Sequence, residues 1–274
     1  MRIATWNVNS LKARMPRVEE WLAEIQPDVL CLQETKLSDA AFPGLSFQAL
    51  GYETAHHGQG QWNGVAILSK VGLTDVTHGF VPDLAQPADE IDDYRAGVLN
   101  EARLLTARCG GVLVSSVYVP NGRNLDDPHW HAKLVWLTHL RRHLDALTTP
   151  ADRVMVLGDF NIAPDDRDVW DPKKFTNSTH VTPQERDRLT HVEGWGLTDL
   201  FRAIYPQDRL YTYWDYRAGD FHMHRGMRID LVLGSASVRQ SLEWAIVDRN
   251  ARKGKLPSDH APVMVQLDSS SWTA

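Results

Sequence analysis

Short apolar runs, rich in Val, Ile and Leu, recur along the chain from Ile3 to Leu267. Most of them are bounded by Gly, Pro, Asn or Asp, which is the pattern of short β-strands buried in a sheet. We expect strands at residues 3–6, 29–32, 64–68, 99–107, 112–119, 154–157, 229–233, 242–247 and 263–267.

Helical patterns are fewer than strand patterns. A helix with Pro16 in its first turn is expected to end before Pro27, because the apolar residues 18, 21, 22 and 25 then share one face. Further helices are expected at 131–147, 183–192 and 197–204. Strands in runs with occasional helices between them favour a layered α/β fold, in which sheets pack together and helices cover the outside.

The length and composition predict one domain. The chain has 274 residues, 43% of them hydrophobic, and no low-complexity tract. Such a chain can bury a sizeable core, and its Pro, Gly and Ser residues are scattered rather than gathered in a linker. We therefore expect a single domain over residues 1–268 and a flexible tail at 269–274.

The compartment is indicated by the N-terminal residues and the cysteines. Charged residues interrupt the first 25 positions, which therefore lack the apolar stretch of a signal peptide. No run approaches the length of a membrane span. Cys31 and Cys109 lie among apolar neighbours and form no metal-ligand or redox spacing, so we expect buried free thiols. Together these features predict a cytoplasmic protein with no membrane contact.

Five apolar runs end at, or begin from, a small cluster of carboxylate, amide or imidazole side chains. The clusters are WNVN at 6–9, LQETK at 32–36, GDFN at 158–161, RID at 228–230 and SDH at 258–260. A sheet whose strand ends converge on one cleft can use such ends to hold a hard cation against an anionic substrate. The clusters lie far apart in the sequence, so they form a site only if the fold brings them together.

The carboxylates of these clusters favour one class of metal. Each of them alone is as readily a helix cap or a turn residue. Together, Glu34, Asp159, Asp230 and Asp259 supply four carboxylates and no cysteine, a ligand set that suits Mg²⁺ or Mn²⁺ rather than zinc. Mg²⁺ typically takes one or two carboxylates and keeps waters, so not all four need to bind it.

The neutral side chains indicate the reaction type. Asn7 and Asn161 can orient a carboxylate or a water without adding charge, and His260 can donate to a phosphate oxygen. Metal, carboxylate-oriented water and imidazole together describe phosphodiester hydrolysis without a covalent intermediate, in which Asp159 activates or aligns the water. Tyr118, at the end of a strand, is either a phenol near the phosphate or an ordinary strand aromatic.

The net charge of −6 argues weakly against a nucleic-acid partner, but the placement of charge matters more than its sum. The acidic residues Asp89, Glu90, Asp92 and Asp93 are interpreted as a solvated loop. Basic residues gather at 249–255, just ahead of SDH, and at 202–228, leading into RID. Both sets lie beside the expected cleft, so the overall charge does not exclude DNA.

Longer motifs surround the five clusters. They are WNVNSLKAR at 6–14, QPDVLCLQETK at 26–36, YVPNG at 118–122, GDFNIAP at 158–164, DVWDP at 168–172, THVTPQER at 179–186, WGLTDLFR at 195–202, YTYWDYR at 211–217, RGMRIDLVL at 225–233 and PSDHAPV at 257–263. On these motifs the chain resembles the exonuclease III family of abasic-site endonucleases, within the wider endonuclease/exonuclease/phosphatase superfamily. The resemblance covers residues 1–267, and only GDFN and SDH are shared across the whole superfamily.

The resemblance implies a four-layered α/β sandwich, with two packed mixed β-sheets flanked by helices. It implies Mg²⁺, which Mn²⁺ can replace, at one end of the sheets. Glu34 is then the principal metal ligand, with Asn7 and Asp259 nearby and with Asp159 and Asn161 in the same set.

The resemblance also assigns catalytic roles. Asp159 resembles the water-activating aspartate, and Asn161 resembles its positioning partner. Asp230, rather than the sequence neighbour Asp259, resembles the partner of His260 at the scissile phosphate. Tyr118 resembles the family's tyrosine that contacts either the scissile phosphate or the leaving group.

The implied activity is that of a Mg²⁺-dependent DNA-repair enzyme, acting as a monomer on double-stranded DNA with abasic sites or blocked 3′ ends. It would cut 5′ to the lesion and also act as a 3′–5′ exonuclease and 3′-phosphatase or 3′-phosphodiesterase. Residues 211–229 would receive a flipped-out sugar without a base. Implied substrate contacts are Asn9, Lys36, Trp62, Asn63, Asn121, Tyr213, Trp214, Arg217, Met227 and Ile229.

Several alternatives stay open. Met227 stands where some relatives carry Trp, which leaves the balance between endonuclease and 3′-end trimming undecided. For Trp62, packing among aromatic residues is favoured over contact with the DNA backbone. A phosphatase on a small or lipid phosphate is disfavoured by residues 211–229, and a binding module without catalysis is disfavoured by the complete set of catalytic side chains. QSLEW at 240–244 faintly resembles sliding-clamp peptides, but a plain strand is favoured.

Overall fold

The computed structural model describes residues 1–82, 92–207, 209–270 and 272. Within these residues the chain forms two six-stranded β-sheets. The first contains β1 (Arg2–Asn7), β2 (Val29–Gln33), β3 (Glu53–His57), β4 (Val65–Ser69), β11 (Leu242–Val247) and β12 (Val263–Leu267). The second contains β5 (Thr74–His78), β6 (Leu104–Cys109), β7 (Val112–Tyr118), β8 (Val154–Asp159), β9 (Leu197–Asp199) and β10 (Asp230–Ser235).

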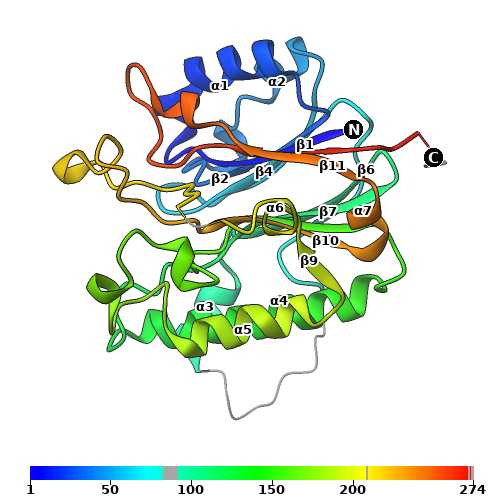
Figure 1. Ribbon diagram of the computed structural model, residues 1–274. Helices are drawn as coiled ribbons and strands as arrows, with labels where there is room; N and C mark the ends of the chain where they lie inside the picture. Colours follow the sequence, from blue (N-terminus) through cyan, green and yellow to red (C-terminus); the bar gives the residue numbers. More distant parts are fainter. Residues whose placement is uncertain (83–91, 208, 271, 273–274) are drawn as a thin grey trace.

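Helices cover the outer faces of both sheets (Figure 1). α1 (Leu11–Ile25) and α2 (Gly44–Ala49) lie over the first sheet, and α3 (Asp93–Leu99), α4 (Pro128–Leu147) and α5 (Pro183–Glu193) lie over the second. The short helices α6 (Leu200–Ile204) and α7 (Ala236–Gln240) both contact β9 and β10 of the second sheet. The expected four-layered α/β sandwich of two mixed sheets is confirmed.

Each sheet contains a parallel pair of strands whose ends carry polar residues. The first sheet has the order β11-β12-β1-β2-β4-β3, in which β1 and β2 are parallel and Asn7 lies opposite Gln33. The second has the order β5-β6-β7-β8-β10-β9, in which β7 and β8 are parallel and Tyr118 lies opposite Asp159. The antiparallel strand β10 begins with Asp230 opposite Asp159. Register alone therefore gathers three candidate site residues at one end of the second sheet.

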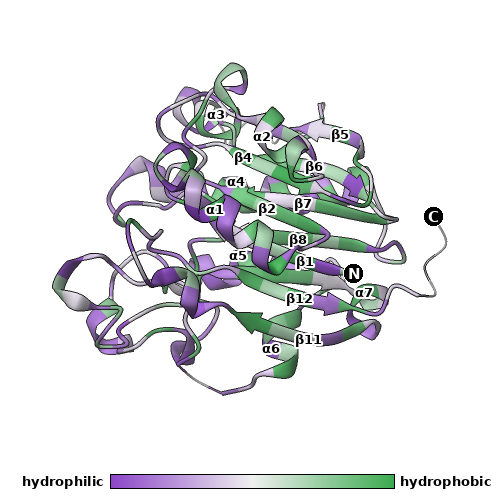
Figure 2. Ribbon diagram, turned by 90° about the horizontal axis from the view of Figure 1, so that it is seen from above, coloured by the Kyte–Doolittle hydropathy of each residue, from purple (hydrophilic) through white to green (hydrophobic). Residues whose placement is uncertain are grey.

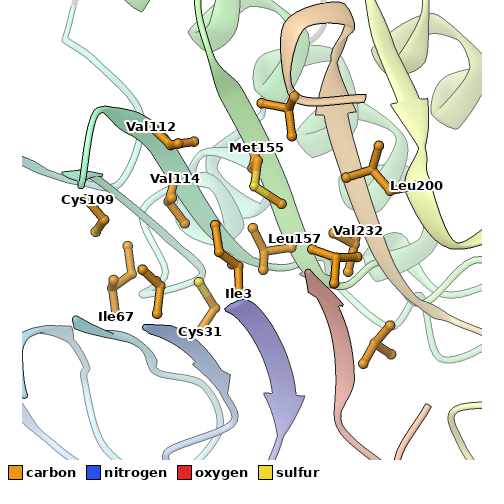
Figure 3. Packing of buried hydrophobic residues seen from close by; sticks show 14 of the residues in the cluster. Ile3, Cys31, Ile67, Cys109, Val112, Val114, Met155, Leu157, Leu200 and Val232 are labelled. Atoms are coloured by element: carbon orange, nitrogen blue, oxygen red, sulfur yellow. The ribbon is translucent and has the colours of Figure 1, made fainter. Parts of the chain in front are cut away.

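The core between the sheets is made from the inward faces of their strands. Ile3, Cys31 and Ile67 from the first sheet meet Leu157 and Val232 from the second, and all five side chains are fully buried (Figure 3). The strands are mostly hydrophobic, whereas the loops are richer in hydrophilic residues (Figure 2). Both cysteines are free and buried, as expected.

Three expected elements differ from the structure. α1 begins at Leu11, so Pro16 lies inside the helix instead of in its first turn, where its ring removes the N–H that would bond to the carbonyl of Lys12. The apolar run at 99–107 is not one strand, because Leu99 ends α3, and β6 begins only at Leu104. The helix expected at 197–204 is the strand β9 followed by the single-turn helix α6, whose first N–H groups are capped by Asp199.

Several sequence features lie partly outside the described residues. Asp89 and Glu90 are outside them, whereas Asp92 caps α3 by accepting a hydrogen bond from the backbone N–H of Arg95. Of the expected tail, residues 271, 273 and 274 are outside them. The indole of Trp272 donates to Ser241 Oγ at 3.3 Å, so this part of the tail contacts the domain. No helix within the described ranges has the length and apolar character needed to cross a membrane.

Candidate active site

Asn7 joins the two sheets at their polar end. Its Nδ2 atom lies 2.8 Å from Glu34 Oε1 and 2.8 Å from Asp159 Oδ2, and it donates a hydrogen bond to each. Glu34 follows β2 in the first sheet, whereas Asp159 ends β8 in the second. One amide therefore holds two carboxylates from different sheets beside each other.

The loop after β2 is shaped to present Glu34. Glu34 and Lys36 both have left-handed backbone conformations, with φ of 51° and 55°. A Cβ atom on Gly64 would lie 2.1 Å from Thr35 Oγ1, so only glycine allows β4 to approach this loop. Lys36 Nζ lies 2.8 Å from Glu34 Oε2. Burial would raise the pKa of Glu34, but the charge of Lys36 and hydrogen bonds from Lys36 and Asn7 lower it overall, which keeps this carboxylate charged.

Asp159 is buried where β7, β8 and β10 meet. A Cβ atom on Gly158 would lie 1.9 Å from the carbonyl oxygen of Val117, which explains the glycine before this aspartate. Burial, together with the nearby Asp230 and Glu34, raises the pKa of Asp159 to about 7 despite the opposing charge of His260. The backbone N–H of Asn161 donates to Asp159 Oδ1 at 2.9 Å and fixes the plane of the carboxylate.

His260 pairs with Asp230, not with its sequence neighbour. Its Nδ1 atom lies 2.8 Å from Asp230 Oδ2, and its Nε2 atom lies 3.8 Å from Asp159 Oδ2. Burial disfavours the imidazolium, but Asp230 and Asp159 outweigh burial and raise the pKa of His260 to about 10. Asp259 instead accepts a hydrogen bond from Asn9 Nδ2 at 3.1 Å.

Tyr118 ends β7 beside these groups. Its ring lies under the guanidinium of Arg103, with Cζ 4.6 Å from the ring centroid. Burial raises the pKa of the phenol well above its ordinary value, and the charge of Glu34 raises it further. The phenol therefore stays protonated at neutral pH and can act as a hydrogen-bond donor.

The site fits a hard divalent cation. Carboxylate oxygens of Glu34 and Asp159 and a ring nitrogen of His260 all lie within 4.8 Å of one another. The raised pKa of His260 keeps both ring nitrogens protonated, which leaves the two carboxylates as candidate ligands. Carboxylates make up this donor set. Burial, and after it the charges of Asp230 and Glu34, raise the pKa of Asp159, and a bound cation would oppose this rise. Asn161 is less available, because its Nδ2 donates to the carbonyl of Val119 and its Oδ1 accepts from Asn121.

The expected substrate contacts are only partly gathered around this centre. Lys36 Nζ donates to Asn9 Oδ1 at 2.6 Å, and the ring of Tyr213 lies tilted by 52° to that of His260, with 4.9 Å between the ring centroids. Tyr213 also pairs through its backbone with Met227, which is buried together with Ile229. These contacts place the 211–229 segment against the imidazole of His260.

Other expected contacts lie elsewhere. Trp214 is fully buried under Arg249, so it supports the 211–229 segment from behind, and its ring is closed to a ligand. Asn63 is buried and offers its carbonyl to the N–H of Lys36 at 2.9 Å. Trp62 is 77% exposed, so its expected packing alternative is wrong. The side chain of Arg217 is exposed and bonded to Asp215.

Some supporting residues were not singled out from the sequence. Ser258 Oγ donates to the carbonyl of Asn7 at 2.7 Å and accepts from the N–H of His260, which joins β1 to the SDH cluster. The sequence feature that could have identified Ser258 is its position directly before Asp259. Lys133 and Glu185 form a buried ion pair behind Asn161, with Nζ and Oε1 2.5 Å apart. The capping box of TPQE at 182–185 marked Glu185, whereas Lys133 carried no signal within an amphipathic helix.

Comparisons with known proteins agree with this geometry. The model of the Endonuclease/Exonuclease/phosphatase family matches residues 4–260. Exodeoxyribonuclease III of Haemophilus influenzae is 30% identical over 275 residues, covering 97% of this chain and 100% of that protein. The structure of an AP endonuclease from Archaeoglobus fulgidus is 32% identical, with a TM-score of 0.90 and coverage of 98% of this chain and 99% of that one.

The protein NExo from Neisseria is a further structural relative. A structure of this 3′–5′ exonuclease from Neisseria meningitidis is 38% identical, with a TM-score of 0.88 and coverage of 98% of this chain and 100% of that one. A structure of the 3′ phosphatase NExo bound to a product DNA hairpin is 37% identical, with a TM-score of 0.88 and coverage of 98% and 99%. The chain therefore belongs to the Endonuclease/Exonuclease/phosphatase family and is a nuclease of the exodeoxyribonuclease III and AP endonuclease type.

Proposed function

We propose that this protein is a Mg²⁺-dependent DNA-repair phosphodiesterase that cuts 5′ to abasic sites and also trims or unblocks 3′ ends. One observation carries the proposal: the carboxylate of Asp159 lies 2.8 Å from the amide of Asn7 and 3.8 Å from the imidazole of His260. An anionic group that can align water thus faces a cationic group that can stabilise phosphate charge.

The residues divide the work of hydrolysis between them. Asp159 accepts a hydrogen bond from the attacking water and aligns it, while the N–H of Asn161 holds this carboxylate in place. His260, kept as an imidazolium by Asp230, donates to a non-bridging oxygen of the phosphate as negative charge develops there. The protonated phenol of Tyr118 donates to the phosphate or to the leaving oxygen.

Glu34 is the principal residue for the cation, with Asp159 beside it and with Asn7, Asn161 and Asp259 orienting the set. When bound, Mg²⁺, or Mn²⁺ in its place, supplies Lewis-acid stabilisation of phosphate oxygens. The oxygen-rich donor set supports this choice of metal over zinc.

Double-stranded DNA with an abasic site or a blocked 3′ end is the proposed substrate. Tyr213, Met227 and Ile229 form an apolar wall next to His260 that suits a sugar without a base. Asn9, Lys36 and Asn121 supply polar groups near the phosphate, and Trp62 and Arg217 supply exposed groups for the flanking strand. NExo is described as a 3′–5′ exonuclease and as a 3′ phosphatase, which supports activity on 3′ ends as part of the proposed function.

The proposal also covers the compartment, the oligomeric state and a possible protein partner. Two free, buried cysteines suit a reducing compartment, so we propose that the protein acts in the cytoplasm. We also propose that it acts as a monomer. A sliding-clamp contact through residues 240–244 has little support, because 242–244 belong to β11 and pair with β12. A clamp-binding peptide would have to leave this sheet.

The experiment is an incision assay on duplex DNA with one abasic analogue, run with Mg²⁺ and with chelator. We expect Mg²⁺-dependent cleavage 5′ to the analogue, and its absence would overturn the proposed endonuclease activity. Glu34→Ala should abolish the response to Mg²⁺. Asp159→Asn should block turnover but leave DNA binding intact, and loss of binding would contradict its role. Recessed undamaged 3′ ends, tested in parallel, measure the balance of activities.

A further inference from the structure

The backbone of Asn161 is held in an unusual conformation from behind the active site. Its φ of 51° lies in the left-handed region, which costs free energy for a residue other than glycine. Its N–H donates to Asp159 Oδ1 at 2.9 Å, so the orientation of this peptide decides where the Asp159 carboxylate points. The N–H belongs to the peptide group before Asn161 and the carbonyl to the peptide group after it, so a contact that fixes the carbonyl acts on Asp159 through the backbone dihedral angles of Asn161.

That carbonyl accepts hydrogen bonds from the ammonium of Lys133 and from the imidazole of His180, which is neutral because burial and the charge of Lys133 lower its pKa to about 4. Lys133 Nζ lies 2.6 Å from it and His180 Nδ1 lies 2.5 Å from it. Lys133 comes from the middle of α4, and its side chain has no exposed surface. Because the ammonium is sealed from solvent, it touches neither DNA nor a cation in the cleft. It can act on catalysis through the groups it contacts and through its charge, which interacts with Asp159.

Burying an ammonium costs free energy unless a carboxylate pairs with it. Here that carboxylate is Glu185, and both of its oxygens accept hydrogen bonds. Glu185 Oε1 lies 2.5 Å from Lys133 Nζ and also accepts from Thr179 Oγ1 and from the N–H of His180. Glu185 Oε2 accepts from the N–H and the hydroxyl of Thr182 at the start of α5. The carboxylate is thus saturated and fixed, and it fixes the ammonium in turn.

We propose that Lys133 is a positioning residue for the hydrolytic reaction. Its buried ammonium, anchored by Glu185, holds the Asn161 carbonyl, and the Asn161 N–H then sets the orientation of Asp159. The proposal rests on the function proposed above, in which Asp159 aligns the attacking water. A purely structural alternative is that the ion pair only joins α4 to α5.

Three variants distinguish a role in positioning Asp159 from a role that only joins α4 to α5. Lys133→Met keeps the length of the side chain but removes the ammonium and leaves Glu185 buried without its partner, so Tm should fall. The double variant Lys133→Met/Glu185→Gln removes that unpaired charge and should recover most of the lost Tm. Arg141→Met is the matched control, because Arg141 also joins α4 to α5 through the carbonyl of His191 but does not contact Asn161.

The readouts are Tm, and kcat and KM for incision of abasic DNA with Mg²⁺. We expect the double variant to regain Tm while kcat stays roughly ten- to a hundredfold below the wild type, with KM nearly unchanged, because a misplaced catalytic group slows chemistry without weakening binding. Arg141→Met should keep wild-type kcat. Recovery of kcat together with Tm, or a change confined to KM, would overturn the positioning role.

An NMR measurement reports on the contact itself. The backbone amide resonance of Asn161 should move in the double variant, because its hydrogen bond to Asp159 changes, and it should stay in place in Arg141→Met. An unmoved Asn161 resonance in the double variant would overturn the proposal. A wild-type protein without Mg²⁺-dependent incision would instead overturn the proposed function, so the two failures are distinguishable.

Discussion

Asp230→Asn is expected to convert His260 from a cation to a neutral imidazole at neutral pH. The substitution keeps the size of the side chain and removes only the charge that faces His260 Nδ1 at 2.8 Å. The Oδ2 atom of Asp230 is buried with its partner, so solvent screens the pair weakly. The perturbation is therefore mainly electrostatic.

The magnitude follows from the pKa of His260. Its rise from the ordinary value of 6.5 to about 10 corresponds to about 5 kcal/mol in favour of the charged form. Burial alone would lower this pKa, and Asp230 is the largest of the causes that oppose burial. Without Asp230 the imidazolium loses most of this support. Removing one charged donor from the developing phosphate charge should then lower kcat by about 10²- to 10³-fold at pH 7.5.

The assay is single-turnover incision of abasic DNA at saturating Mg²⁺ between pH 6 and 8.5. The ratio of variant to wild-type rate should rise as the pH falls, because His260 in Asp230→Asn regains its proton only at lower pH, and the ratio cancels ionisations common to both proteins. Asp152→Asn, at the opposite end of the second sheet, is the control and should match the wild type. A ratio that does not change with pH would refute the reasoning.

Three further predictions concern the core, acid stability and DNA binding. Leu157→Ala, between the sheets, should lower the free energy of unfolding by about 3 kcal/mol in urea titration, and a loss below about 1 kcal/mol would contradict close packing there. Burial lowers the pKa of His143 to about 4, so the folded protein binds fewer protons than the unfolded chain between pH 6.5 and 4. The contribution of His143 to stability should thus be full above pH 6.5 and fall by up to about 3 kcal/mol as the pH drops to 4. His143→Gln should therefore make Tm fall less steeply with pH than in the wild type, and an equally steep fall would contradict this assignment. Trp62→Ala should weaken binding of abasic duplex about tenfold in fluorescence anisotropy and leave single-turnover incision at saturating enzyme unchanged; unchanged affinity would exclude it from the interface.

Central strands were predictable from the sequence because both of their faces are buried. β2, β4 and β8 read as continuous apolar runs, and their polar ends marked Glu34 and Asp159. The edge strands β3 and β5 carried no such signal, because their residues are mostly exposed or half-buried. The edge strand β11 is an exception, because it was predicted at 242–247 although most of its residues are half-buried or exposed.

The site was predictable in its chemistry but not in all its contacts. Carboxylates at strand ends indicated a cation site, and the family resemblance paired His260 with Asp230. Sequence adjacency alone points to Asp259 instead, because the contact between His260 and Asp230 depends on the fold. Lys133 and Glu185 are 52 positions apart on two helices, and neither residue type is expected inside a protein. Their ion pair follows from the packing of α4 against α5, which the sequence pattern alone does not predict.

The placement of β1 between β2 and β12 has a consequence for the newly made protein. The N-terminal amine bonds to the carbonyl of Leu267, and Asn9 contacts Asp259 across 250 positions of sequence. A ribosome therefore releases β12, His260 and Asp259 long after Asn7 and Glu34 have emerged. A chain synthesised only as far as the end of β8 holds Asn7, Glu34 and Asp159 but lacks Asp230 and His260, so we expect it to be unable to cut DNA until β12 closes the first sheet.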